Sequence, residues 1–93
     1  MVEFEWDEAK NQLNIAKHGV SFEKAQEIFN GDTYTRVDES FHYDEIREIS
    51  VGMIKGILFL TVVHTDTKTG NIRLISARRA NKWERQRYEK TLR

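Results

Sequence analysis

Hydrophobic and polar residues alternate at the start of the chain, and the pattern then changes to helical spacing. Phe4 and Trp6 alternate with acidic residues, and this period of two predicts a short edge strand. Asp7 is a favourable N-cap, and Gly19 tolerates the left-handed conformation in which many helices end. We therefore expect a first helix over residues 8–17.

A second helical pattern follows and leads into the least regular part of the sequence. Ser21 is a favourable N-cap, and apolar residues recur at helical spacing over residues 22–29. We expect a short strand over residues 34–37 and a loop over residues 38–45, which are acidic and aromatic.

From Arg47 onward the pattern becomes that of a sheet. Apolar and polar residues alternate over residues 49–53, Lys55-Gly56 supplies a turn, and residues 57–63 are almost wholly apolar. This pattern is typical of a hairpin whose second strand is central in a sheet. A third strand over residues 72–77 follows a turn-rich loop.

The chain ends in a polar helix. Asn81 and Glu84 form a capping-box pattern at the start of a helix over residues 82–92, whose large apolar residues do not line up on one face. There is no proline, repeat or low-complexity tract to mark a linker, so we expect residues 1–93 to form one domain. We predict an α+β fold: a small antiparallel meander with two amino-terminal helices and one carboxyl-terminal helix.

Composition removes several classes of protein. The chain has no cysteine, which excludes disulfides, thiolate nucleophiles and cysteine-bound metal centres. No apolar run approaches the roughly 20 residues that span a bilayer, and the acidic amino terminus lacks a signal-peptide pattern. We therefore expect a cytoplasmic protein with no membrane contact.

The net charge of zero conceals an asymmetry along the chain. Residues 1–46 hold four Lys/Arg against eleven Asp/Glu, and residues 47–93 hold eleven against four. Such a division favours a basic surface for a polyanion beside an acidic surface that docks something else. Two solvated faces that attract one another would give the same composition.

The basic residues concentrate near the carboxyl terminus, where aromatic residues are interleaved with them. Residues 72–93 contain eight Lys/Arg and two Glu. Arginine matches the geometry of phosphate oxygens, and Trp83 and Tyr88 offer ring faces on which bases stack. The pattern indicates nucleic-acid binding, although a solvated helix with incidental ion pairs has a similar composition.

Three histidines, His18, His42 and His64, are further candidates for chemistry. They lack metal-ligand spacing, and the chain has no Walker loop, dinucleotide fingerprint or GxSxG elbow, so we expect neither metal nor cofactor. His64 lies where the central strand meets its loop, and it either caps the strand or reaches a cleft beside Arg73 and Arg78. His18 lies at a helix end, where a cation is stabilising without any further role.

Cleavage of RNA without a metal requires a base near the ribose 2′-hydroxyl, cationic groups around the phosphate, and an acid at the leaving 5′-oxygen. Arg47, Arg73 and Arg78 are candidates for the cationic groups. The candidates for base or acid, among which the sequence does not choose, are His64, Tyr88 and Lys17.

Several stretches of the chain resemble the BrnT family of ribonuclease toxins. The resemblance lies in Phe4-Glu5-Trp6-Asp7-Glu8-Ala9-Lys10-Asn11, Lys17-His18-Gly19-Val20-Ser21-Phe22-Glu23-Lys24-Ala25, Arg47-Glu48-Ile49-Ser50-Val51-Gly52, Val62-Val63-His64-Thr65, and Ile72-Arg73-Leu74-Ile75-Ser76-Ala77-Arg78-Arg79-Ala80 with the later Glu84-Arg85 and Tyr88-Glu89. It spans nearly the whole chain. The resemblance implies a RelE-like fold and a growth-blocking ribonuclease, the toxin of a type II toxin–antitoxin system.

The resemblance also implies partners and site residues. The partners are an RNA substrate and a BrnA-like antitoxin of the ribbon-helix-helix class, which we expect in a complex of two toxins and two antitoxins that binds operator DNA. Together with the basic cluster, the resemblance marks as catalytic Arg47, His64, Arg73, Arg78 and Tyr88. The predicted RNA-binding residues are Lys17, His18 and Arg79, which the resemblance marks, and Lys82 and Arg85, which the basic cluster adds.

Two other interpretations remain open. The same arginines would serve a non-catalytic module that binds nucleic acid, and the charged last helix would serve an interaction protein that docks a partner. Cleavage of RNA identifies the enzyme, and a steep loss of affinity with salt identifies phosphate contacts. We also expect Arg78→Ala to abolish most cleavage without unfolding the domain, because an exposed strand-end arginine contributes little to stability.

Overall fold

The predicted α+β architecture is confirmed in a computed structural model, which describes residues 2–39 and 45–92. Much of the loop expected over residues 38–45, His42 included, lies outside the described residues. In chain order the elements are β1 (Phe4–Glu5), α1 (Glu8–His18), α2 (Phe22–Ala25), the 3-10 helix η1 (Gln26–Asn30), β2 (Thr33–Val37), β3 (Arg47–Ile54), β4 (Leu58–Asp66), β5 (Ile72–Arg79) and α3 (Lys82–Leu92). No described helix has the length and apolar character needed to cross a membrane.

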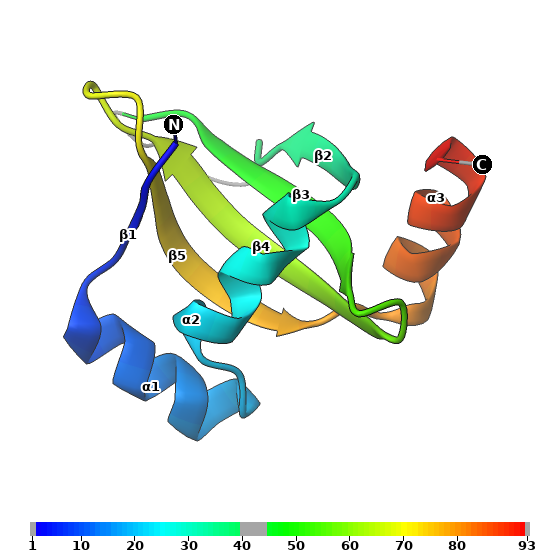
Figure 1. Cartoon of the computed structure of the whole chain (residues 1–93), viewed down its shortest axis with the longest axis horizontal. Helices are drawn as coiled ribbons and strands as arrows, with labels where there is room; N and C mark the ends of the chain where they lie inside the picture. Colours follow the sequence, from blue (N-terminus) through cyan, green and yellow to red (C-terminus); the bar gives the residue numbers. More distant parts are fainter. Residues whose placement is uncertain (1, 40–44, 93) are drawn as a thin grey trace.

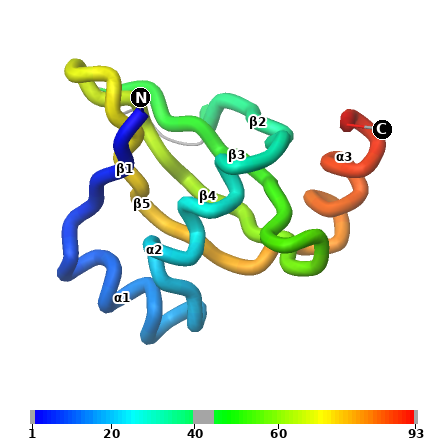
Figure 2. Tube along the Cα trace, viewed as in Figure 1, coloured from blue at the N-terminus to red at the C-terminus, as the bar shows by residue number. Residues whose placement is uncertain are grey.

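The strands form one sheet in the order β1-β5-β4-β3-β2 (Figure 1). Strands β2 to β5 make the predicted antiparallel meander. The edge strand β1 runs parallel to β5, with Phe4 beside Ile72 and Glu5 beside Arg73 (Figure 2). The sheet is therefore mixed, because the amino terminus pairs with a strand from the other end of the chain.

Local capping signals position the helices as the sequence predicts. Asp7 and Ser21 accept hydrogen bonds from the first turns of α1 and α2, and α1 ends at Gly19 with φ 70°. Asn81 and Glu84 exchange hydrogen bonds between side chain and backbone at the start of α3. Each signal involves residues close in sequence, so neighbouring residues alone determine it.

Helix α1 is attached to the sheet by asparagine side chains. The amide of Asn14 donates to the Ala77 carbonyl at 2.8 Å and accepts from the Ala77 N–H at 3.1 Å. Asn11 accepts from the Phe22 N–H at 2.8 Å. These are the two buried residues of α1, whereas Leu13 is 69% exposed. Buried amides that are satisfied in this way fix the helix in one position.

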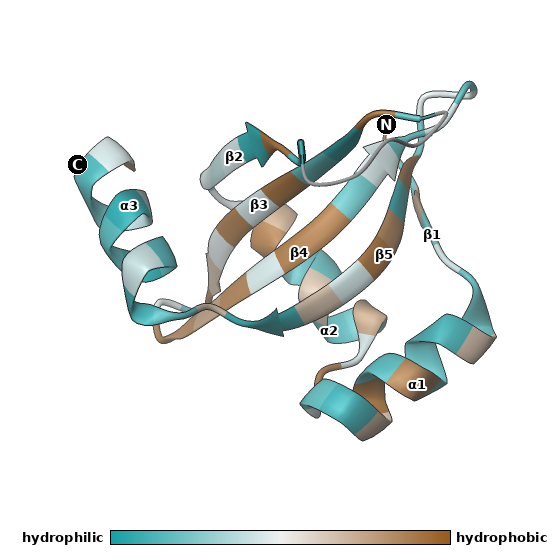
Figure 3. Cartoon of the chain, turned by 180° about the vertical axis from the view of Figure 1, so that it is seen from behind, coloured by the Kyte–Doolittle hydropathy of each residue, from teal (hydrophilic) through white to brown (hydrophobic). Residues whose placement is uncertain are grey.

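The apolar core lies between the sheet and the layer formed by α1, α2 and η1. Its fully buried members include Phe22, Ala25, Ile28, Leu60, Val62 and Ala77. Gly52 allows η1 to pack closely, because a Cβ at that position would lie 2.6 Å from the Cβ of Ile28. Figure 3 shows the other face of β4 and β5, which no helix crosses, with α3 standing at one end of the sheet.

Candidate functional site

Three of the predicted catalytic arginines lie on the face of the sheet that the helix layer leaves uncovered. Arg47 on β3 pairs with Thr65 on β4, and Thr65 pairs with Arg73 on β5. Arg78 pairs with Thr61. Along β4, Thr61 and Thr65 alternate with the core residues Leu60 and Val62. The two threonines, and the arginines paired with them, therefore point away from the core. At about 3.3 Å per residue, the Arg47–Arg73 row lies about 13 Å along the strands from Arg78.

A register shift brings Arg73 and Arg78 to the same face. They lie an odd number of positions apart, so a regular strand would send them to opposite faces. The pairing of β4 with β5 instead skips Ile75. One extra residue in a strand re-aims every side chain beyond it. In agreement, Leu74 and Ala77 are both buried in the core, with exposures of 1% and 0%.

Arg78 is held by a buried carboxylate at the start of α3. Its Nη1 and Nη2 donate to the two Glu84 carboxylate oxygens at 2.8 and 2.9 Å. The Glu84 side chain is 2% exposed and that of Arg78 is 40% exposed. Burial raises the pKa of Glu84, but the bonds from Arg78 and from the Asn81 N–H outweigh it and leave the pKa below its ordinary value. Arg78 is thus part of the packing, not the freely exposed residue that the sequence suggested.

At the end of this face farther from Arg78, arginine side chains lie among carboxylates. Arg47 and Arg73 line a cavity of about 470 Å³, whose other charged lining residues are Lys10 and the carboxylates Glu5, Asp7, Glu8 and Glu45. Arg73 donates to one Glu5 oxygen from Nε at 3.0 Å and from Nη2 at 2.8 Å, and these bonds lower the pKa of Glu5. The Nε of Arg47 lies 3.5 Å from a Glu45 oxygen.

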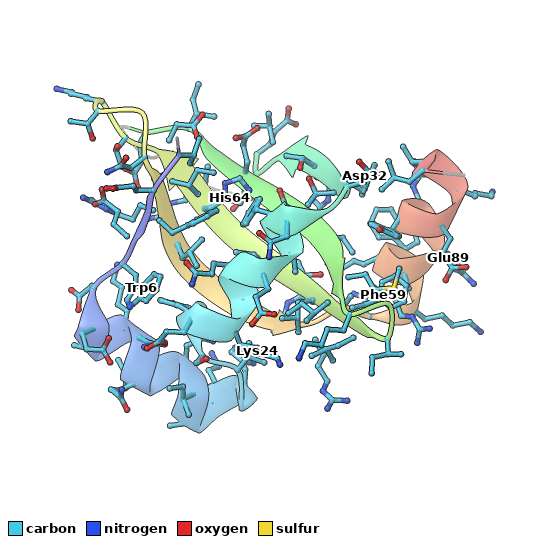
Figure 4. The ribbon with its side chains drawn as sticks, viewed as in Figure 1. Trp6, Lys24, Asp32, Phe59, His64 and Glu89 are labelled. Atoms are coloured by element: carbon cyan, nitrogen blue, oxygen red, sulfur yellow. The ribbon has the colours of Figure 1, made fainter. Side chains whose placement is uncertain are left out.

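His64 lies on the opposite face and is not brought together with the arginines. Its side chain packs in the core beneath η1 (Figure 4), where it is 4% exposed and its ring meets Phe29 edge-on with 5.0 Å between centroids. The Nε2 atom lies 2.7 Å from the Ser50 hydroxyl. Burial lowers the pKa of His64, which favours the neutral ring. The cleft position that the sequence suggested for His64 is therefore not found.

Three predicted RNA-binding residues also lie away from the arginine face. Lys17 and His18 end α1, in the helix layer. Arg79 lines a separate cavity that also includes Gly19 and Lys24. The structure therefore groups these cations near the end of α1 and not with Arg47, Arg73 and Arg78.

The predicted residues of α3 are divided between solvent and the sheet. Lys82 is exposed. The guanidinium of Arg85 lies 4.6 Å from the centroid of the Phe59 ring, and Tyr88 meets the same ring edge-on with 5.4 Å between centroids. Figure 4 shows Phe59 beside α3. Arg85 and Tyr88 therefore help to hold α3 against the sheet.

Two arginines lie beside the Trp83 ring: Arg36, which had no predicted role, and Arg87, which was predicted as a member of the basic cluster of residues 72–93. The Arg36 and Arg87 guanidinium carbons lie 5.8 and 5.5 Å from the centroid of the Trp83 ring. Arg36 pairs with Ile49, two positions from Arg47, so it extends the arginine face toward β2. The five residues of β2 have no clear apolar side. The sequence therefore does not show which face of this strand is buried, and it does not predict that Arg36 lies on the arginine face.

Within residues 2–39 and 45–92, no three His, Asp or Glu side chains form a group suited to a metal ion. Residues 6–84 match the family described as the ribonuclease toxin BrnT of type II toxin–antitoxin systems. The fold is similar to the crystal structure of the Brucella abortus ribonuclease toxin BrnT, with a TM-score of 0.64 and 24% sequence identity over 88% of this chain and 100% of that one. No curated protein matches the sequence. Because the family match covers most of the chain, the protein belongs to the BrnT family of ribonuclease toxins of type II toxin–antitoxin systems.

Proposed function

We propose that this toxin is an endoribonuclease that needs no metal and stabilises the reacting phosphate with arginine. The observation that carries the proposal is the shared face of Arg47, Arg73 and Arg78, which exists because β5 skips Ile75 in its pairing. Guanidinium groups bind phosphate oxygens with two parallel hydrogen bonds. The Arg47–Arg73 row and Arg78 lie about 13 Å apart along the strands. Over that distance an extended RNA strand presents more than one phosphate.

The reacting phosphate fits the end of the face that holds Arg47 and Arg73. The carboxylate of Glu45 borders the same cavity and is the group we assign as base. His64 lies on the other face and Tyr88 packs against Phe59, so neither has access to this end. Lys17 belongs to the helix layer.

In the proposed reaction Glu45 accepts the proton of the ribose 2′-hydroxyl, and the 2′-oxygen forms a bond to phosphorus. The bond from phosphorus to the 5′-oxygen breaks, and a water molecule relays the proton from Glu45 to that oxygen. The products are a 2′,3′-cyclic phosphate and a free 5′-hydroxyl. Arg47 and Arg73 stabilise the added negative charge, each by about 3 kcal/mol if they act like the donors of an oxyanion hole.

The test is cleavage of a defined single-stranded RNA in EDTA, followed by analysis of the fragment ends. We expect 2′,3′-cyclic or 3′-phosphate ends, and a loss of roughly 100-fold or more in rate for Arg73→Ala and Glu45→Gln. Lys24→Ala, which removes an exposed cation of α2, is the matched control and should cleave normally. Cleavage that EDTA abolishes and magnesium restores would overturn the proposal. Folded protein that binds RNA without cutting it would identify a binding module.

A type II toxin has a cognate antitoxin, and we propose that this one is a BrnA-like ribbon-helix-helix protein. We propose further that two toxins and two antitoxins form the complex and that it binds operator DNA. In support of a docking surface on the amino-terminal half, Leu13 and Ile15 of α1 are 69% and 38% exposed. The mass of the purified complex by light scattering tests the stoichiometry. Leu13→Asp should weaken the complex, and unchanged affinity would exclude this surface.

A further inference from the structure

We infer that Trp83 and Arg36 form a subsite that stacks one unpaired base of the RNA, beside the phosphate contacted by Arg78. The inference rests on the proposed function, because it assigns the substrate contact next to the arginine face. Of the two rings that the sequence predicts for stacking, Trp83 and Tyr88, Trp83 belongs to this subsite.

The exposure of Trp83 sets it apart from the other aromatic residue of α3. Tyr88 meets the Phe59 ring edge-on and is half-buried. The Trp83 side chain is 52% exposed although the indole ring is large and apolar. Tryptophan is enriched at binding interfaces, because its ring offers a large apolar area and its N–H a hydrogen-bond donor.

Two guanidinium groups already lie over the Trp83 ring. Arg87 comes from the next turn of α3, and Arg36 comes from β2, where it extends the arginine face. Cation–π contacts of this kind hold arginine planes near an aromatic ring. A base that enters between the indole and one guanidinium gains a stacking partner on each side, and its negatively charged backbone gains the arginine charge.

The buried Glu84 fixes the distance between this ring and the phosphate site. Glu84 directly follows Trp83 in the chain, and both of its carboxylate oxygens bind Arg78. The same carboxylate accepts the Asn81 N–H, so the first turn of α3 is tied to β5. Trp83 and Arg78 are therefore held in a fixed relation, as required of two groups that bind parts of one strand.

The space beside Trp83 suits a nucleoside. A cavity of about 610 Å³ lies next to the ring, and its other described lining residues are Gln86, Arg87, Glu89 and Lys90. The lining offers one aromatic face, two cations, an amide and the Glu89 carboxylate. All of these residues belong to α3, so the cavity adjoins Trp83 on the helix side, and Arg36 approaches the ring from β2. Stacking of this kind tolerates every base, so we expect the subsite to raise affinity for single-stranded RNA with little preference for sequence.

The experiment uses a single-stranded 2′-O-methyl RNA, which the proposed reaction cannot cleave, cut to the shortest length that binds with full affinity so that the protein cannot shift along it. In a series of such strands one position at a time lacks its base. For wild-type protein one abasic position should lower affinity roughly 5- to 150-fold, which corresponds to about 1–3 kcal/mol for one stacked base. Trp83→Ala should bind the complete strand with affinity lowered by the same factor. Removal of the base at that position should then lower the affinity of Trp83→Ala no further. Trp83→Phe should keep most of the affinity.

Val2→Ala, a truncation of an apolar residue that is 52% exposed, as Trp83 is, is the matched control and should behave as wild type. An unchanged abasic profile in Trp83→Ala would overturn the inference. A Trp83→Ala protein that binds RNA normally but loses the antitoxin would also overturn it and assign the ring to the protein partner. Stacking without any cleavage in EDTA would refute the proposed reaction and leave the subsite standing, so the two failures are distinguishable.

Discussion

Replacement of Arg78 by alanine should destabilise the domain as well as impair cleavage. Glu84 is 2% exposed, and three hydrogen bonds, two from Arg78 and one from the Asn81 N–H, hold its carboxylate. The substitution removes both charged bonds and leaves a buried anion with neutral donors alone, the Asn81 N–H and the nearby Thr61 hydroxyl. The cost therefore arises from the carboxylate that remains and not from the arginine that is lost.

The magnitude follows from the burial of the two partners. Removal of one partner of a buried ion pair costs about 3–5 kcal/mol. Arg78 is 40% exposed, so the space that it leaves admits water to Glu84, and we expect the lower end, about 3 kcal/mol at pH 7. A domain of this size has about 5–15 kcal/mol of stability. The variant should therefore remain folded at room temperature with a reduced free energy of unfolding.

The dependence on pH supplies a second signature. In the wild type the pKa of Glu84 is lowered, so its stabilising contribution is present above the ordinary value of 4.5 and is lost as pH falls through the folded value. In Arg78→Ala, burial without the arginine should raise that pKa above its ordinary value. Protonation then relieves the destabilisation as pH falls from 7 toward 5, and the two stability curves should converge.

Urea unfolding at pH 7 and pH 5, followed by circular dichroism, measures both effects. The double variant Arg78→Ala/Glu84→Gln carries no buried charge, and its amide still accepts the Asn81 N–H, so it should lose only about 1 kcal/mol. An Arg78→Ala protein as stable as wild type at pH 7 would refute the reasoning. So would a double variant as unstable as the single one. Cleavage by Arg78→Ala must be compared where both proteins are fully folded.

Further predictions concern the core and the site. Gly52→Ala should lower the free energy of unfolding in urea by about 1–3 kcal/mol, because the new Cβ would meet the Cβ of Ile28 at 2.6 Å. Gly31→Ala, whose Cβ would have no atom within 4 Å, should be nearly neutral. Equal effects of the two substitutions would contradict the close packing of η1. Burial lowers the pKa of His64, so neutral His64 stabilises the fold above its ordinary value of 6.5 and this contribution fades as pH falls through the folded value. His64→Gln should therefore lose less stability than wild type between pH 7 and pH 5. An identical loss in both proteins would show that protonation of His64 does not cause the acid destabilisation of the wild type. In RNA cleavage His64→Gln should keep activity while it is folded, and inactivity of the folded variant would return His64 to the catalytic site.

Features encoded by neighbouring residues were predictable from the sequence, and features encoded by distant pairing were not. The capping box of Asn81 and Glu84 needs only a single turn of chain, and the sequence pattern identified it. The parallel pairing of Phe4 with Ile72 joins the two ends of the chain, and no local alternation carries that information. The ion pair of Glu84 with Arg78 depends on where α3 meets β5, so the sequence showed Glu84 as a cap alone.

The candidate site was hardest to predict where it depends on which face of a strand a side chain occupies. Residues 57–63 are almost wholly apolar, so the pattern does not tell which face of the strand His64 occupies. Simple alternation along β5 places Arg73 and Arg78 on opposite faces, and only the skipped Ile75 reverses this. Glu45 follows a segment without periodicity, so the pattern did not show that it borders the same cavity as the distant Arg73.

The weak amphipathic character of α3 is explained by how the helix is held. Glu84 is its one buried residue within the described part of the helix, and the helix meets the sheet through charge at Arg78 and through Arg85 and Tyr88 on the Phe59 ring. A helix fixed by a buried carboxylate keeps its remaining cations and Trp83 at the surface, where an apolar stripe would have withdrawn them into the core. A phosphate that contacts the Nε and remaining Nη2 donors of Arg78 shares the guanidinium with Glu84 instead of displacing it. The proposed binding of RNA and the attachment of α3 would thus use one arginine without competing for the same hydrogen bonds.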